Sequence, residues 1–163
     1  MSVLATIEKQ SNYHIATFKR PLLYSIDAVW AAMTNNENLQ KWMSNLEIIE
    51  LRKNGKIHFN MNDGTGNFEE ITITDYVEKE VLEFGWGTDT VRFELFSTEK
   101  GSLLVLVETL QNLTEHTPKD LAGWHICLDM LKDLLNGVDH QYFPMDEWQQ
   151  RFSEYQKMLN SIK

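Results

Sequence analysis

Residues 117–137 of this 163-residue chain read TPKDLAGWHICLDMLKDLLNG, and this stretch decides the fold. Thr117 is a typical N-cap, Pro118 suits the first helical turn and Gly137 marks the end, which together predict a helix over 118–136. One apolar face of this helix would hold Leu121, Trp124, Leu128, Leu131 and Leu135, with Cys127, Met130 and Leu134 beside it. A long, broadly apolar helix that closes a strand-rich chain indicates a curved sheet wrapped around it.

The preceding residues alternate with a period of two, which is typical of strands with one solvated face. Ile57, Phe59 and Met61 point one way in this pattern, and Asn54-Gly55 before them is a strong hairpin signal. We expect strands at 13–19, 46–51, 56–62, 68–77, 82–86, 91–95 and 102–109, with two short helices after the first. The fold class is therefore α+β, with an antiparallel sheet of about six to seven strands.

A second helix is expected at the end of the chain. Its apolar positions recur at three-four spacing and are Met145, Trp148, Phe152, Tyr155, Leu159 and Ile162. We predict a single domain over 1–163, with a core at about 12–137 and an additional amphipathic helix at 144–162. The apolar stripe of that helix either packs on its own domain or pairs with a protein partner or a second copy, as a homodimer through 145–162.

Composition narrows the classes of partner. The formal net charge is −9, which opposes binding to nucleic acid and to an anionic membrane surface. No apolar run approaches the ~20 residues of a membrane span, and Met1 to Asn12 lacks a signal-peptide core. Cys127 is the single cysteine, so an internal disulfide and a Cys-rich zinc site are excluded. These features predict a cytoplasmic protein.

Several short motifs occur in a recognisable order. They are Val29-Trp30 with Met33-Thr34, Lys41-Trp42-Met43, Phe84-Gly85-Trp86, and Gly123-Trp124-His125 with Cys127-Leu128-Asp129. Over about residues 12–137 the chain resembles the START-like superfamily, in the branch similar to the C-terminal domain of the activator of heat-shock-protein-90 ATPase. The resemblance implies a helix-grip fold. It also implies a carrier of apolar or aromatic small molecules, a protein-contact role as in the heat-shock relatives, or more rarely a cyclase or aromatase.

The first hypothesis for function is a ligand cavity between the sheet and the long helix. Phe59, Met61, Ile71, Trp86 and Phe93 would line its sheet side, Trp124, Leu128 and Leu131 its helix side, and Trp42 its mouth. Aromatic and methionine side chains suit adaptable apolar pockets. The alternative is that the same residues fill a solid core.

Polar chemistry has few candidates. Glu69 and Glu108 are candidate polar anchors or acids, although strand ends and solvated faces also explain a lone Glu; Glu108 stands where relatives often carry His. His125 and Asp129 share a helical face but have no third ligand, so we expect a solvated surface, no metal and no cofactor. We therefore predict a non-enzymatic module for a hydrophobic or aromatic small molecule. The alternatives are a co-chaperone-like interaction domain and a cyclase-type or aromatase-type enzyme.

Overall fold

The computed structural model describes residues 2–162, which form one antiparallel sheet and four helices. The sheet has eight strands in the order β1-β2-β8-β7-β6-β5-β4-β3. The strands are β1 Thr6–Lys9, β2 His14–Leu22, β3 Leu46–Ile48, β4 Lys56–Asn60, β5 Phe68–Val77, β6 Val81–Trp86, β7 Asp89–Thr98 and β8 Gly101–Leu110. The helices are α1 Ile26–Thr34, α2 Asn36–Trp42, α3 Thr117–Leu135 and α4 Met145–Ile162.

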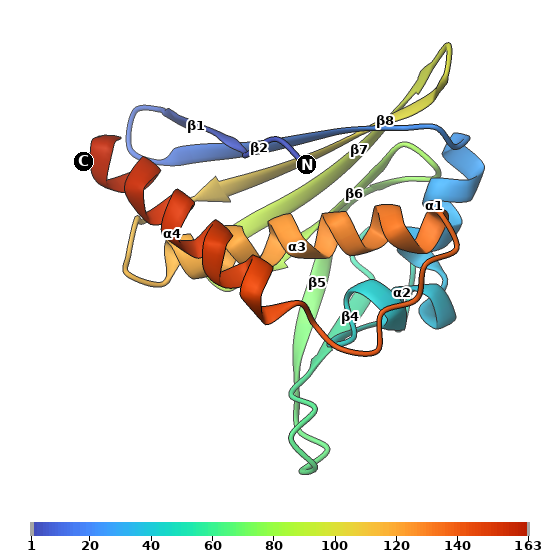
Figure 1. Ribbon diagram of the computed structural model, residues 1–163. Helices are drawn as coiled ribbons and strands as arrows, with labels where there is room; N and C mark the ends of the chain where they lie inside the picture. The colour runs from blue at the N-terminus through green and yellow to red at the C-terminus, as the bar shows by residue number, and fades with distance from the viewer. Residues whose placement is uncertain (1, 163) are drawn as a thin grey trace.

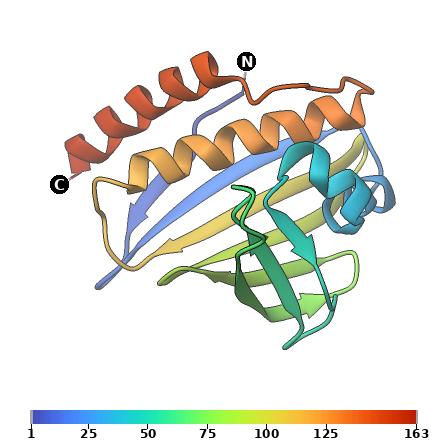
Figure 2. The same cartoon turned by 90° about the horizontal axis from the view of Figure 1, so that it is seen from below.

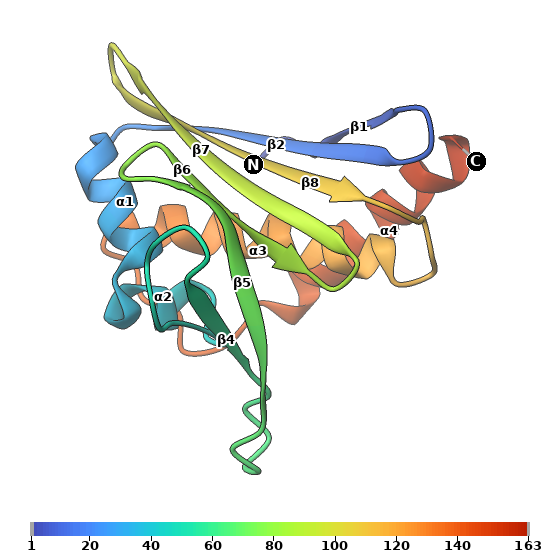
Figure 3. The ribbon, with the colours of Figure 1, turned by 180° about the vertical axis from the view of Figure 1, so that it is seen from behind.

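The long helix α3 crosses one face of the sheet, and α4 runs beside it on the side away from the strands (Figures 1 and 2). The short helices α1 and α2 lie together near the C-terminal end of α3. Seen from behind, the sheet's strands cover α3 from the other side (Figure 3). This arrangement confirms the predicted α+β helix-grip fold.

Two differences from the predicted sheet concern its N-terminal edge. The sheet gains a strand, because β1 pairs with β2 from Thr6↔Thr17 to Lys9↔His14. This edge strand is mostly exposed, so no apolar alternation in the sequence marks it. The next strand was expected over 13–19, but it continues to Leu22, with Pro21 paired to Leu103.

Local capping explains where the helices begin. Ser25 Oγ accepts a hydrogen bond from the Ala28 amide and starts α1, and the Asn35 side chain accepts from the Glu37 and Asn38 amides and starts α2. For α3 the expected cap at Thr117 is shifted. Thr117 is already helical, and its Oγ1 accepts from the Thr114 amide at 2.9 Å. Gly137 follows the helix with φ of 80°, which suits glycine.

The middle of the interface between α3 and the sheet is solidly packed. Trp124, Leu128 and Leu131 are buried on α3, and Phe93 is buried opposite them on β7. Phe93 contacts both Trp42 and Trp124 edge-on, with ring centroids 6.3 Å and 5.8 Å away. Between the sheet and the short helices α1 and α2, a gap beside Trp42 and Phe93 has a volume of only about 10 Å³, about the space of one water molecule.

The second face of α3 is covered by α4 and by the N-terminal segment. His125 was expected on a solvated surface, and that expectation is wrong, because its side chain is 0% exposed. Its Nδ1 lies 2.8 Å from the Tyr155 hydroxyl on α4, and its Nε2 lies 2.7 Å from Ser2 Oγ. The Ala5 amide donates to the same Tyr155 hydroxyl at 2.9 Å. Burial lowers the pKa of His125 to about 3, so the ring is neutral and joins the three segments.

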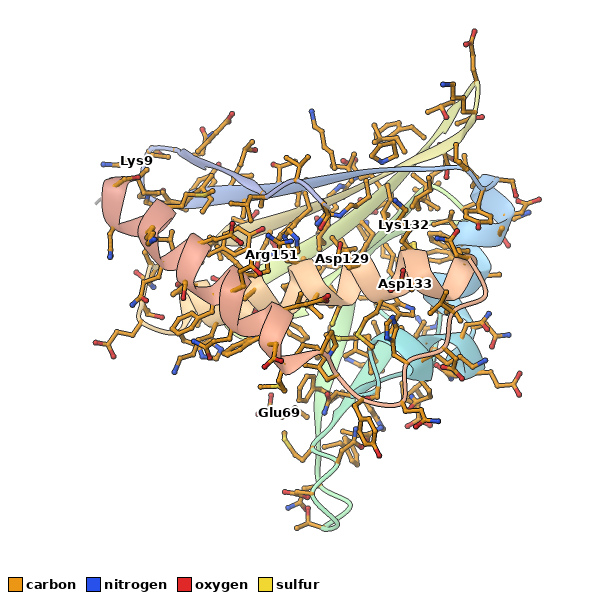
Figure 4. The ribbon with its side chains drawn as sticks, in the orientation of Figure 1. Lys9, Glu69, Asp129, Lys132, Asp133 and Arg151 are labelled. Carbon is orange, nitrogen blue, oxygen red and sulfur yellow. The ribbon has the colours of Figure 1, made fainter. Side chains whose placement is uncertain are left out.

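Charged residues surround this covered face. Three charged residues of α3 lie on the side of that helix where Arg151 of α4 also lies; they are Asp129, Lys132 and Asp133 (Figure 4). Buried Arg20 of β2 donates to the Val3 carbonyl at 3.0 Å and lies 3.9 Å from Asp129. None of the helices between residues 2 and 162 has the length and apolarity that crossing a membrane requires.

Candidate functional site

A cavity of about 400 Å³ lies at the end of the helix grip where α3 begins. Its wall is built from β4, β5 and β6, from the turn between β6 and β7, and from the segment that links β8 to α3. The lining residues are Phe59, Glu69, Ile71, Trp86, Gly87, Thr88, Asp89, Leu110, Asn112, Thr114, His116, Thr117 and Asp120. The cavity is therefore shifted toward the N-terminus of α3 from the packed centre of the helix.

The sheet side of the cavity is aromatic and apolar. Phe59 and Trp86 meet edge-on with ring centroids 5.6 Å apart, and Ile71 and Leu110 complete this surface. Trp124 lies behind Trp86 at a centroid distance of 5.1 Å and supports it from the core. Such a rigid aromatic wall suits a flat apolar group of a ligand.

The helix side of the cavity is acidic. Asp120 lies in the first turn of α3, and its Oδ1 accepts a hydrogen bond from Trp86 Nε1 at 2.8 Å. Asp89 begins β7, and its Oδ1 accepts from the Gln111 amide at 2.9 Å. Burial, together with the charge of Asp120, raises the pKa of Asp89. Both carboxylates lie beside Trp86, because Asp120 accepts from its indole N–H and Asp89 is its partner on the adjacent strand.

Glu108 stands behind this acidic wall and is 0% exposed. Its neighbours in the sheet are Ala16 and Val91, and it shares the inward face of β8 with Leu110, which lines the cavity. Within residues 2–162, nothing makes a well-formed hydrogen bond to either carboxyl oxygen of Glu108. Burial and the neighbouring Asp120 raise its pKa well above the usual value. These surroundings therefore favour the neutral form of the Glu108 carboxyl group.

The structure places four of the predicted site residues at the cavity and the others elsewhere. Phe59, Ile71, Trp86 and the candidate anchor Glu69 line the cavity. Trp42, Phe93, Trp124, Leu128 and Leu131 lie in the packed interior instead. Met61 follows the end of β4 and does not line the cavity, and Glu108 lies behind the wall. The Glu69 side chain extends from β5 near the protruding hairpin, away from the charged residues of α3 and α4 (Figure 4).

Asp89 and Asp120 were missed by reasoning from the sequence. In the sequence, Asp120 is an ordinary acidic residue in the first turn of a predicted helix, where the helix dipole favours a negative charge. The sequence pattern around Asp89 predicts a turn. Only the folded arrangement brings both beside Trp86, and the available signal was that Asp89 closely follows the strand that ends at Trp86.

Metal binding has no support among the described residues. Between residues 2 and 162, no three His, Cys, Asp or Glu side chains are arranged as a metal site. Burial raises the pKa of Cys127 to about 12, so this thiol is protonated and is a poor nucleophile or ligand.

Known proteins share this architecture and sequence pattern. The sequence model of the family described as Activator of Hsp90 ATPase homolog 1-like protein matches residues 23–136, which is more than half of the chain. The chain belongs to this family. It is thus a member of the START-like superfamily, as its motifs predicted. The match begins within the loop before α1 and ends just after α3, so it includes the whole cavity wall.

Solved structures extend the comparison beyond the family match. The conserved protein of unknown function EF2215 from Enterococcus faecalis is 29% identical and superposes with a TM-score of 0.86, over 98% of this chain and 92% of that one. CalU16 from Micromonospora echinospora is 18% identical, with a TM-score of 0.73 over 96% of each chain. Protein NE0264 from Nitrosomonas europaea is 20% identical, with a TM-score of 0.64 over 80% of this chain and 98% of that one. The last two show the fold alone. Comparison with curated proteins found no match.

Proposed function

We propose that this member of the Activator of Hsp90 ATPase homolog 1-like family binds an apolar or aromatic small molecule in the cavity beside Trp86, without transforming it. The observation that carries the proposal is the cavity itself. Its volume of about 400 Å³ falls in the range of about 300–1,000 Å³ that is usual for small-molecule sites. Its apolar surface of Phe59, Ile71, Trp86 and Leu110 provides the hydrophobic wall on which such sites depend, and polar residues surround that surface.

Two other functions are weaker candidates. An enzyme of the cyclase or aromatase type needs acid and base groups placed at the reacting atoms, and the two buried-side candidates in the wall, Asp120 and Asp89, are already held by the Trp86 indole and the Gln111 amide. A co-chaperone-like role rests on the family's description and would use a protein partner. Pairing through the exposed apolar residues of α4, such as Met145, stays a prediction, as does a cytoplasmic location.

A thermal-shift screen of aromatic and lipid-like compounds tests the binding function. A ligand that binds only the native state raises the unfolding free energy by about 2.7 kcal/mol at one hundred times its Kd. For a domain of this size the melting temperature should rise by roughly 5–10 °C. The screen should be repeated on Ile71→Trp, which fills the cavity from β5.

Thr74→Trp is the matched control, because Thr74 is an exposed residue of the same strand. We expect compounds to stabilise the wild type and Thr74→Trp but not Ile71→Trp. If no compound stabilises the wild type, or if Ile71→Trp responds equally, the cavity is not the binding site. The protein-partner function would then be the better account.

A further inference from the structure

The charged residues of the cavity wall restrict the chemical class of the ligand more than its apolar surface does. Glu69, Asp89 and Asp120 line the cavity, and neither lysine nor arginine occurs among the lining residues that the structure describes. His116 is the one other ionisable side chain among these lining residues. A concave, partly apolar site with charges of one sign concentrates ligands of the opposite charge.

Asp120 is the carboxylate best placed to meet a ligand. Trp86 Nε1 holds its Oδ1 at 2.8 Å, so the carboxylate is fixed beside the face of the aromatic wall. A ligand that stacks on Trp86 and Phe59 therefore brings its polar end next to a fixed negative charge.

Glu108 provides a second, independent observation. A fully buried carboxyl group without a well-formed hydrogen bond is costly unless it is neutral or meets a partner. It lies on the inward face of β8, between core residue Leu106 and cavity residue Leu110, next to Asp120. Trp124 Nε1, behind Trp86, is also buried without a partner among the described residues. Behind the cavity wall, the Glu108 carboxyl group thus lies against Asp120, and Trp124 Nε1 is a buried donor without an acceptor.

We infer that the cavity selects molecules with an aromatic or apolar body and a protonated amine, with the amine held by Asp120 and Asp89 and the body packed on Trp86 and Phe59. This inference rests on the proposed function and names the ligand class. The amine is attracted to the carboxylates and to the face of the tryptophan, where cations bind favourably. A carboxylate ligand of the same shape is repelled.

The test compares three compounds that share one aromatic body: naphthylethylamine, naphthylethanol and naphthylacetate. Their dissociation constants for the wild type are measured by titration calorimetry. We expect the amine to bind about tenfold or more tightly than the alcohol, since a hydrogen bond to a charged group usually contributes at least that factor. The acetate should bind most weakly.

Asp120→Asn should lower the affinity for the amine about tenfold and leave the alcohol nearly unchanged. The asparagine oxygen still accepts from Trp86, so the wall keeps its geometry. Asp133→Asn is the control, because Asp133 is an aspartate on the same helix that contacts His140, away from the cavity. Both variants change the net charge of the protein equally. A general attraction of the amine to an acidic protein therefore affects both in the same way and cannot explain a difference between them.

Two results overturn the inference. If alcohol and amine bind equally well, or if Asp120→Asn leaves amine binding unchanged, the cavity binds apolar bodies without selecting the amine, and the proposed function stands alone. If none of the three compounds binds, the proposed function fails together with the inference. The comparison of compounds on the wild type decides the matter even where a variant folds poorly.

Discussion

Glu108 is an ionisable residue whose complete burial disfavours its charged form. Its raised pKa means that the folded protein binds a proton that the unfolded chain releases above a pKa of about 4.5. The stabilising effect of that proton is fully present below the unfolded pKa. It is lost as the pH rises toward the folded pKa, by up to about 1.4 kcal/mol per pH unit.

Glu108→Gln should remove this dependence. We expect the wild type to lose stability relative to the variant as the pH rises from about 5 to about 8, because glutamine has no proton to release. Urea denaturation across that range gives both profiles. Parallel profiles would mean that Glu108 ionises as readily in the folded protein as in the unfolded chain.

Tyr155 is the residue that joins the N-terminal segment, α3 and α4. Tyr155→Phe leaves the Ala5 amide and His125 Nδ1 without their shared partner, so the free energy of unfolding should fall by about 1–3 kcal/mol. Tyr142→Phe is the control, because Tyr142 is 82% exposed, and it should change stability by less than about 0.5 kcal/mol. Equal effects in denaturant titrations would show that the Tyr155 hydroxyl has no such role.

The elements show what the sequence can and cannot predict. The extent of α3 to within one residue, the presence of two short helices after the first expected strand and the alternating strands follow from helix-end residues and periodicity, which are local properties. The position of the cavity does not, because a pattern shows which residues face inward but not where packing leaves space. Trp124 and Trp86 look alike in the sequence, yet one is in the core and the other lines the cavity.

His125 is a second example, in which the sequence does not show whether a helix face is covered by other segments. The sequence shows the broad apolar stripe that α3 turns to the sheet, but not that α4 and the N-terminal segment cover its other face. Ala122 and Ile126, both fully buried, are the signal on that face. A polar residue among them is then expected to be buried and hydrogen-bonded.

The packed middle of α3 predicts the effect of added volume there. Leu128→Trp should destabilise the protein by about 1–3 kcal/mol, because its surroundings are filled and cannot accept a larger ring without strain. Lys132→Trp places the same side chain at an exposed position of the same helix and should have little effect. Thermal or urea unfolding compares them, and a neutral Leu128→Trp would reveal unfilled space in the middle of the grip.

At the scale of the whole molecule, one end of the helix grip is solid and the other is open. α1 and α2 pack near the C-terminal half of α3, whereas the cavity lies beside its first turn (Figure 2). We propose that residues 1–163 act as a single domain, in which α4 and the N-terminal segment hold α3 from outside while its first turn meets the ligand.

The central claim is that ligands bind beside Trp86, and the indole N–H signals of the five tryptophans test it directly. Naphthylethylamine and naphthylethanol are titrated into nitrogen-15-labelled protein, with the Trp86 signal assigned through Trp86→Phe. Trp30 is an internal control, since it packs on Tyr76 and does not line the cavity. The account predicts a saturable shift of the Trp86 signal with an unchanged Trp30 signal. An unmoved Trp86 signal, or equal shifts at both residues, would contradict it.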